Sequence, residues 1–253
     1  MKILLSPAKS LNENCNHIRT DYTQPILIDK TKILASNLKA KSVDDLKTLM
    51  KLSLPLAQLN FDRFQNWKTP FSTKNSFPCG WVFNGDAYKG LDYMTLDNED
   101  IAFSQNSLRI LSGFYGVLKP LDLIQPYRLE MGTRLQVNDD VKNLYSFWGD
   151  QITDTINDEI HNNELIVNLA SNEYFKAINT KKLTGDLVSC SFKENRGGEL
   201  KMIMSYAKKA RGLMTRYLIQ NKIENKEDLI GFNTEGYIFD SSLSNESEYI
   251  FVR

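Results

Sequence analysis

The chain of 253 residues is poor in the side chains on which many enzymes depend, with only two histidines and three cysteines. The cysteines, Cys15, Cys79 and Cys190, are widely spaced and form neither a CxxC motif nor a disulfide framework. Histidine-based acid–base catalysis and histidine-rich zinc sites are disfavoured, because only His17 and His161 are available. The glycine motifs of dinucleotide and P-loop sites are also missing. The sequence therefore predicts no cofactor, no metal site and no recognisable catalytic centre.

Long apolar runs are absent as well. No stretch of 18 apolar residues could cross a bilayer, and the short apolar N-terminus ends at Ser6 and Pro7, too soon for a signal peptide. Hydrophobic residues make up 42% and charged residues 25%, which is typical of globular proteins. No linker or repeat divides the chain. We expect a cytoplasmic monomer without a membrane partner, folded as a single domain over residues 1–253.

The spacing of apolar residues indicates interleaved helices and strands. Helices are predicted over residues 29–41, 42–51, 53–67, 143–161 and 206–222. Strands are predicted over residues 2–5, 164–169, 236–239 and 248–252, with a hairpin formed by 188–192 and 200–204 and a loop over 68–80. No regular βαβ rhythm appears. The pattern predicts an irregular α/β, α+β-like fold with a mixed sheet and surrounding helices.

The net charge is zero, but the charges are unevenly distributed. Residues 193–222 hold eight lysines and arginines against two glutamates, whereas residues 137–164 and 224–253 are acidic. Lys208, Lys209, Arg211 and Arg216 lie on the helix predicted from residue 206. Cations near a helix start are suited to a phosphate, although charge runs are more often simply solvated faces.

Residues 106–134 contain a Gly113-x-x-Gly116 turn between two apolar elements. This pattern resembles a helix-hairpin-helix, in which backbone N–H groups meet a phosphate without reading a base. The alternative is a tight turn inside the core, with Phe114 and Tyr115 packed around it. Four cations surround the turn: Arg109, Lys119, Arg128 and Arg134.

Two shorter segments are candidate ligand loops. Asn-Gly-Asp-Ala-Tyr-Lys-Gly at residues 84–90 presents Asp86 and Lys89, although Asn-Gly-Asp is also ordinary turn chemistry. Ser-Pro-Ala-Lys-Ser at residues 6–10 places Lys9 beside hydroxyl groups at the end of the first predicted strand.

Seven segments in this order resemble the YaaA family of bacterial peroxide-stress resistance proteins. They are LLSPAKSLN (4–12), FNGDAYKGLD (83–92), LRILSGFYGVLKPLDLIQPYRLEMG (108–132), LYSFWGD (144–150), NLASNEYFKA (168–177), YAKKARGLMTRY (206–217) and GFNTEGYIFD (231–240). The resemblance extends over essentially the whole chain.

The resemblance implies a compact α/β domain that protects against hydrogen peroxide, is associated with limiting free iron, and binds double-stranded or structured DNA. Binding would use a basic cleft and a helix-hairpin-helix-like element. The residues that match such a site are Lys9, Lys89, Arg109, Gly113, Gly116, Lys119, Arg128, Arg134, Lys208, Lys209, Arg211 and Arg216.

The leading hypothesis is a non-catalytic DNA-binding protein that acts during peroxide stress. It predicts that Gly113 and Lys208 share one positive face, and that the acidic segments face away from it. An alternative is an enzyme acting on a nucleotide or nucleic acid. Its pocket would combine Lys9, Asp86, Lys89, Lys208, and Arg128 with Glu130.

Two further hypotheses assign iron or redox chemistry to the chain. Iron sequestration would use carboxylates, and a thiol sensor would use Cys79, which has no cation beside it in the sequence. The candidate iron ligands are Asp97, Glu99, Asp100, Asp139 and Asp140.

Overall fold

The computed structural model describes residues 1–13, 21–161 and 163–253, so Cys15 and His17 lie outside the described residues. The strands are β1 (Lys2–Leu5), β2 (Ser10–Leu11), β3 (Phe77–Pro78), β4 (Phe83–Asn84), β5 (Leu108–Ser112), β6 (Gly116–Leu118), β7 (Leu123–Ile124), β8 (Leu165–Leu169), β9 (Asp186–Arg196), β10 (Glu199–Lys201), β11 (Ile238–Phe239) and β12 (Glu248–Val252). The α-helices are α1 (Ile28–Lys39), α2 (Val43–Met50), α3 (Leu54–Asn66), α4 (Cys79–Val82), α5 (Asp86–Leu91), α6 (Asn98–Ser107), α7 (Leu144–Trp148), α8 (Gln151–Asn157), α9 (Asn172–Phe175) and α10 (Met204–Gln220). The described residues also form three 3-10 helices, η1 (Tyr93–Thr95), η2 (Lys226–Gly231) and η3 (Thr234–Gly236).

A mixed sheet forms the centre of the molecule. In the described part of the chain it has eight strands in the order β11-β12-β9-β8-β1-β5-β6, with β10 paired to β9. The strands from β12 to β5 run parallel, and β11 and β6 pair antiparallel at the two edges. Every residue of β1, β5 and β8 is buried, as expected for parallel strands covered on both faces. The predicted α/β fold with a mixed sheet is confirmed.

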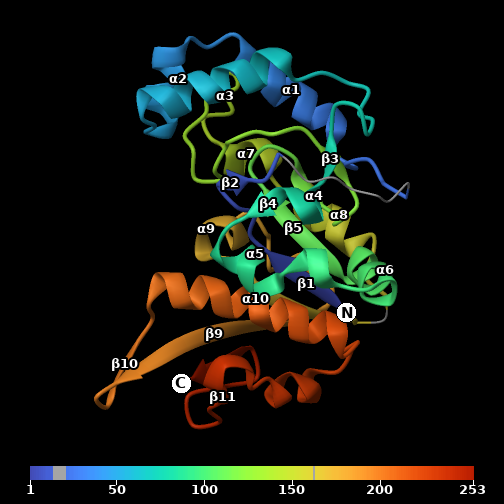
Figure 1. Cartoon of the computed structure of the whole chain (residues 1–253), viewed down its shortest axis with the longest axis vertical. Coiled ribbons are helices and arrows are strands. Elements are labelled where there is room, and N and C mark those ends of the chain that lie inside the picture. Colours follow the sequence, from blue (N-terminus) through green and yellow to red (C-terminus); the bar gives the residue numbers. More distant parts are fainter. Residues whose placement is uncertain (14–20, 162) are drawn as a thin grey trace.

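The helices are distributed along the long axis of the molecule. Figure 1 shows α1, α2 and α3 together at one end, and α10 with the C-terminal strands at the other. These three helices match the helices predicted over residues 29–67, and Ser42 begins α2 with the expected capping box to Asp45. The basic helix α10 begins at Met204, two residues before its predicted start, and packs against β9, β1 and α5.

Other segments differ from the expected pattern. The predicted helix over residues 143–161 is two helices, α7 and α8, because the chain turns at Gly149 and Asp150. Residues 68–80 contain β3 and the start of α4 rather than only a loop. The β9–β10 hairpin is present, with Gly197 and Gly198 in the turn, and β9 is longer than predicted.

One hydrophobic core joins segments from the whole chain, from Ile3 through Leu34 and Phe114 to Ile219 and Phe251. Strands and helices distant in sequence therefore hold one another in place. Among the residues that the structure describes, no helix combines the length and apolar character needed to cross a membrane.

Candidate functional site

A cavity of about 400 Å³ opens where β1 and β8 end. These strands are parallel neighbours, with Leu5 opposite Leu169, so their carboxyl ends lie side by side. Both residues line the cavity, as do Ser6 and Ser171, which follow the two strands. Ligands of open α/β sheets bind outside the carboxyl ends of the strands. The fold therefore places this cavity where such proteins hold their ligands.

Hydrogen bonds fix the two strand ends at the bottom of the cavity. The Ser171 N–H donates to Ser6 Oγ over 2.9 Å, and the Tyr88 hydroxyl donates to the Ser6 carbonyl over 3.0 Å. Tyr88 and Tyr174 both line the cavity. Burial raises the pKa of both hydroxyls well above the ordinary value, so both are neutral at physiological pH. The floor is thus apolar and aromatic, with neutral hydroxyl groups.

Two helices form one wall of the cavity, and glycines let them approach closely. A Cβ on Gly212 of α10 would lie 1.7 Å from the Ala87 carbonyl oxygen of α5. A Cβ on Gly90 of α5 would lie 2.3 Å from the Lys209 carbonyl oxygen of α10. Only glycine fits either position, because any larger residue would push the two backbones apart. The pair of glycines therefore sets the spacing of this wall.

The wall presents three cations to the cavity: Lys89 from α5, and Lys208 and Arg211 from α10. Lys208 and Arg211 are three residues apart and so lie on the same helix face. Within the described residues, no carboxylate lies within 4.0 Å of any of the three. Burial lowers the pKa of the Arg211 guanidinium, which nevertheless stays charged at neutral pH. Three cations without counter-ions make this wall attractive to an anion.

Lys9 and Arg128 meet through the shared carboxylate of Glu130. Lys9 Nζ lies 2.6 Å from Glu130 Oε2, and Arg128 Nη2 lies 3.3 Å from Glu130 Oε1. Lys9 lines the cavity, whereas Arg128 does not line it and is linked to Lys9 through Glu130. The acidic side chains that line the cavity are Asp86 and Glu173. The site thus combines cations in excess with two carboxylates.

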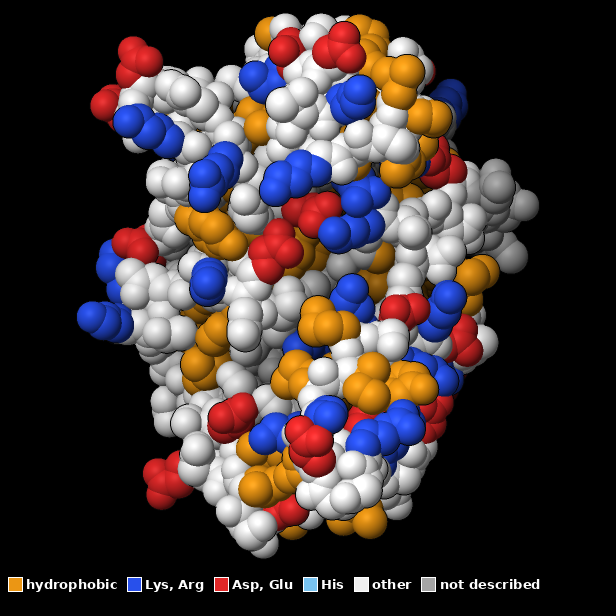
Figure 2. Space-filling model, turned by 90° about the vertical axis from the view of Figure 1, so that its left-hand side faces the viewer, with side chains coloured by type: hydrophobic (Ala, Val, Ile, Leu, Met, Phe, Trp, Pro, Cys, Tyr) orange, Lys and Arg blue, Asp and Glu red, His pale blue; other side chains and the backbone are white. Residues whose placement is uncertain are grey.

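A shallower hollow of about 590 Å³ adjoins the cavity. Glu173 lines both, and the hollow continues past Lys51, Glu130 and Arg134. Together we call them the cleft. Figure 2 views the side where α9 and the start of α10 lie in Figure 1, and shows lysine and arginine side chains above and below a hollowed region, with carboxylates among them. Of the predicted DNA-binding residues, the structure brings Lys9, Lys89, Lys208 and Arg211 together in the cavity, with Arg128 and Arg134 beside them.

Sequence reasoning missed the contribution of α9. Ser171, Glu173 and Tyr174 line the cavity, although only Lys9 and residues 84–90 were identified as candidate loops. Their position in the sequence was the signal that could have identified them. The Ser-Asn-Glu segment begins two residues after the end of a buried strand, and Ser-Pro-Ala-Lys-Ser begins immediately after β1. Polar residues after two parallel strands meet at one edge of the sheet.

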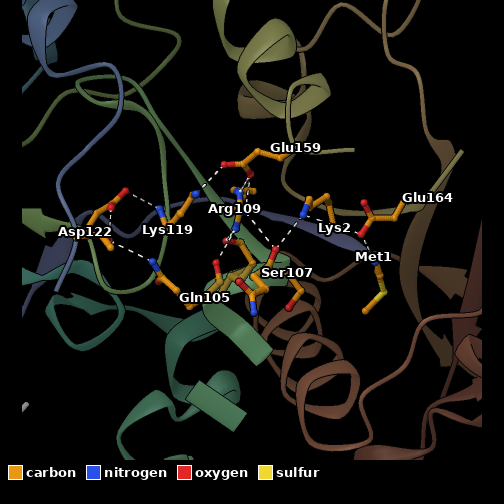
Figure 3. Close-up of polar contacts among 12 residues, drawn as sticks. Met1, Lys2, Gln105, Ser107, Arg109, Lys119, Asp122, Glu159 and Glu164 are labelled. Carbon is orange, nitrogen blue, oxygen red and sulfur yellow. Dashed lines mark hydrogen bonds and ion pairs between the residues drawn. The ribbon is translucent and has the colours of Figure 1, made fainter. Parts of the chain in front are cut away.

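Arg109 and Lys119 lie elsewhere, toward the amino ends of the parallel strands. Figure 3 shows them converging on Glu159. Arg109 Nε donates to Glu159 Oε2 over 2.6 Å, and its remaining nitrogens donate to backbone carbonyls such as that of Gln105. Arg109 is buried and Lys119 Nζ lies 2.7 Å from Glu159 Oε1. Both cations are already paired with a carboxylate within the protein, away from the cleft.

The expected helix-hairpin-helix is a β-hairpin. Residues 108–112 and 116–118 are the antiparallel strands β5 and β6, with Ser112 opposite Gly116. Gly113 is buried, and a Cβ there would lie 2.4 Å from the Leu129 carbonyl oxygen. Gly116 has a φ of +76° and packs against Trp148. The helical prediction was wrong, because the elements on both sides of the turn are strands, and both glycines are buried.

Two cations of α10 are also engaged by other parts of the protein. Lys209 pairs with Glu235, and Arg216 Nη1 donates to the carbonyls of Leu91 and Asp92 over 3.0 and 2.9 Å. The acidic C-terminal segment therefore does not face wholly away from the basic helix, because Glu235 neutralises part of it.

The iron and thiol hypotheses find no geometric support in the described residues. No group of three or more potential metal-ligating side chains occurs there. Asp97 instead caps α6, and Asp100 pairs with Lys222. Cys79 is buried with its thiol 2.9 Å from the Lys119 carbonyl, and burial raises its pKa well above the ordinary value. A thiol in this state is a poor nucleophile.

Comparisons with known proteins agree with the resemblance of the segments. The family described as peroxide stress protein YaaA matches residues 1–243. A UPF0246 protein of Flavobacterium psychrophilum is 50% identical over 253 residues, covering 100% of both chains. UPF0246 proteins of Marinomonas sp. and of Neisseria meningitidis serogroup B are 50% and 48% identical, covering 100% of this chain and 97% and 98% of theirs. The chain belongs to the peroxide stress protein YaaA family.

Proposed function

We propose that this protein resists peroxide stress by binding DNA through the cleft without reading its sequence, and so limits iron-driven damage to the chromosome. The observation that carries the proposal is the gathering of Lys9, Lys89, Lys208 and Arg211 around one cavity, with Arg134 in the adjoining hollow. Lysines and arginines supply most of the affinity of proteins for the DNA backbone. Peroxide damages DNA where ferrous iron meets it, so a protein bound there is well placed to protect it.

The arrangement favours backbone contacts over base contacts. The cations come from the loop after β1, from α5 and from α10, so no single helix or ribbon presents all of them to a major groove. Phosphate contacts of this kind position a protein without specifying sequence. In this proposal the protein acts in the cytoplasm as a monomer, because one copy supplies the complete cleft.

The test is the salt dependence of duplex binding. Replacing Lys89 and Lys208 by alanine removes two cations that have no counter-ion within the described residues. The slope of log affinity against log salt should fall by about two units, with no change in sequence preference. The matched control replaces Lys119 and Lys226 by alanine, because both are paired to carboxylates near the amino ends of the strands. An unchanged slope in the first variant would overturn the proposal.

A second candidate is an enzyme acting on a nucleotide or nucleic acid. It is favoured by the meeting of Lys9, Asp86 and Lys208 in one cavity, with Arg128 linked to it through Glu130. Lysine beside a carboxylate can serve in acid–base catalysis without histidine. Incubation with nucleotides and DNA, followed by mass spectrometry, tests this candidate. A product formed by the wild type and not by Asp86→Asn would favour it over plain binding.

A further inference from the structure

The cavity lies at the point where the chain reverses its direction across the sheet. From β1 the chain goes to β5 on one side, and then returns to β8 and β9 on the other. The crevice between the carboxyl ends of β1 and β8 is therefore a topological switch point. Open α/β sheets bind small ligands in this crevice, because the loops on either side diverge and leave a space between them. A cavity with Ser6 and Ser171 at its base occupies this place.

The size of the cavity limits what can enter it. A volume of about 400 Å³ is within the range of pockets for small molecules and cofactors. A DNA duplex cannot descend into a cavity of this size and can only lie across its mouth. Only a small molecule or a single nucleotide could therefore reach Leu5, Tyr88, Leu169 and Tyr174 inside the cavity.

The charges divide the cavity into two parts. Lys89, Lys208 and Arg211 form a cationic wall without counter-ions among the described residues, which suits a phosphate group. Glu173 belongs to α9, whereas that wall is formed by α5 and α10. Its Oε1 accepts from the Gly132 N–H over 2.9 Å, and its Oε2 has no hydrogen bond to the described residues. Glu173 Oε2 is thus available to accept a hydrogen bond from a sugar hydroxyl or an amino group.

We propose that this cavity binds a free nucleoside monophosphate. The phosphate lies against Lys89, Lys208 and Arg211, the sugar hydroxyls donate to Glu173, and the base packs on the apolar and aromatic floor. This inference uses the site of the second candidate function but requires neither turnover nor DNA binding. It gives the floor and Glu173 a role that a DNA backbone lying across the mouth does not explain.

Calorimetric titration of the full chain tests the proposal, with adenosine monophosphate, adenosine and inorganic phosphate as probes. We expect the monophosphate to bind at least about tenfold more tightly than either fragment, since it alone engages both parts of the cavity. Lys89→Ala with Lys208→Ala should weaken the monophosphate more than about tenfold, and Lys119→Ala with Lys226→Ala should leave it unchanged. Equal affinity for the monophosphate and inorganic phosphate would overturn the proposal, and so would the absence of binding.

Glu173→Gln separates the two parts of the ligand. It should weaken the monophosphate several-fold while leaving inorganic phosphate unchanged, whereas a merely structural role would change both equally. Thermal unfolding of each variant checks that it is folded.

Duplex binding by the same variants distinguishes the nucleotide proposal from the DNA proposal. If duplex binding depends on Lys89 and Lys208 but the monophosphate does not bind, the nucleotide site is wrong and the DNA proposal stands.

Discussion

Lysines and arginines lie at both ends of the parallel strands, but their surroundings differ. Toward the amino ends, Arg109 and Lys119 converge on Glu159, and both are paired with its carboxylate. At the carboxyl ends, Lys89, Lys208 and Arg211 face a cavity, and none has a counter-ion among the described residues. Composition alone makes the two clusters look equivalent. The difference shows that in this neutral chain the pairing of a cation, rather than its presence, determines whether its charge is available to a ligand.

The cluster of Arg109, Lys119 and Glu159 should contribute far more to stability than to binding. Arg109→Ala removes a buried guanidinium that donates to Glu159 and to three backbone carbonyls, and leaves Glu159 with Lys119 as its remaining partner. We expect the free energy of unfolding to fall by about 3–5 kcal/mol, the usual cost of removing one partner of a buried ion pair. Urea unfolding followed by circular dichroism measures it. DNA affinity per folded molecule should be unchanged, and a loss of affinity without loss of stability would reverse the comparison.

Asp122 lies beside Lys119, and the pKa of its carboxyl group is raised. Burial raises the pKa of Asp122 from 3.8 to about 6, although it accepts hydrogen bonds from Thr23 Oγ1 and the Lys119 N–H. An acid whose pKa is higher in the folded state than in the unfolded state stabilises the fold fully below the unfolded value. That contribution is lost as the pH rises through the folded value.

Asp122→Asn tests this displacement, because the amide keeps the shape and cannot ionise. The stability of the variant relative to the wild type should increase between about pH 4 and pH 6, by up to about 3 kcal/mol, and remain constant above that window. Urea unfolding at a series of pH values measures the difference. A difference that is constant with pH would mean that the folded and unfolded pKa values are the same.

The strands and helices with clear periodicity could be predicted from the sequence, because local patterns determine them. The helices α1 to α3 and the strands β1 and β8 are of this kind. The Gly113-x-x-Gly116 segment was misread because apolar runs around a short glycine turn occur in both helical and β-hairpins. The full burial of β5, which identifies it as a central strand, depends on distant elements. Local pattern is therefore insufficient at that point.

The same limit applies to the site. The grouping of Lys9, Asp86, Lys89 and Lys208 was available as a hypothesis, since each lies in a segment with loop or helix-start chemistry. The sequence could not predict which of the cations are paired with carboxylates. Glu159 lies 50 residues from Arg109, and Glu235 lies 26 residues from Lys209, so no local rule connects them. The pairing depends on the tertiary fold.

The smallest expected effect separates neighbouring residues of α10. Lys208 faces the cavity, whereas Lys209 pairs with Glu235 on the other side of the helix. Lys209→Ala should lower the free energy of unfolding by only about 0.5 kcal/mol, as for an exposed ion pair, and leave the salt slope of DNA binding unchanged. Lys208→Ala should leave stability unchanged and lower that slope by about one unit. Both variants lose one positive charge, so net charge cannot explain a difference between them. Equal slopes would show that position relative to the cleft is irrelevant, and that only the overall charge of the helix attracts DNA.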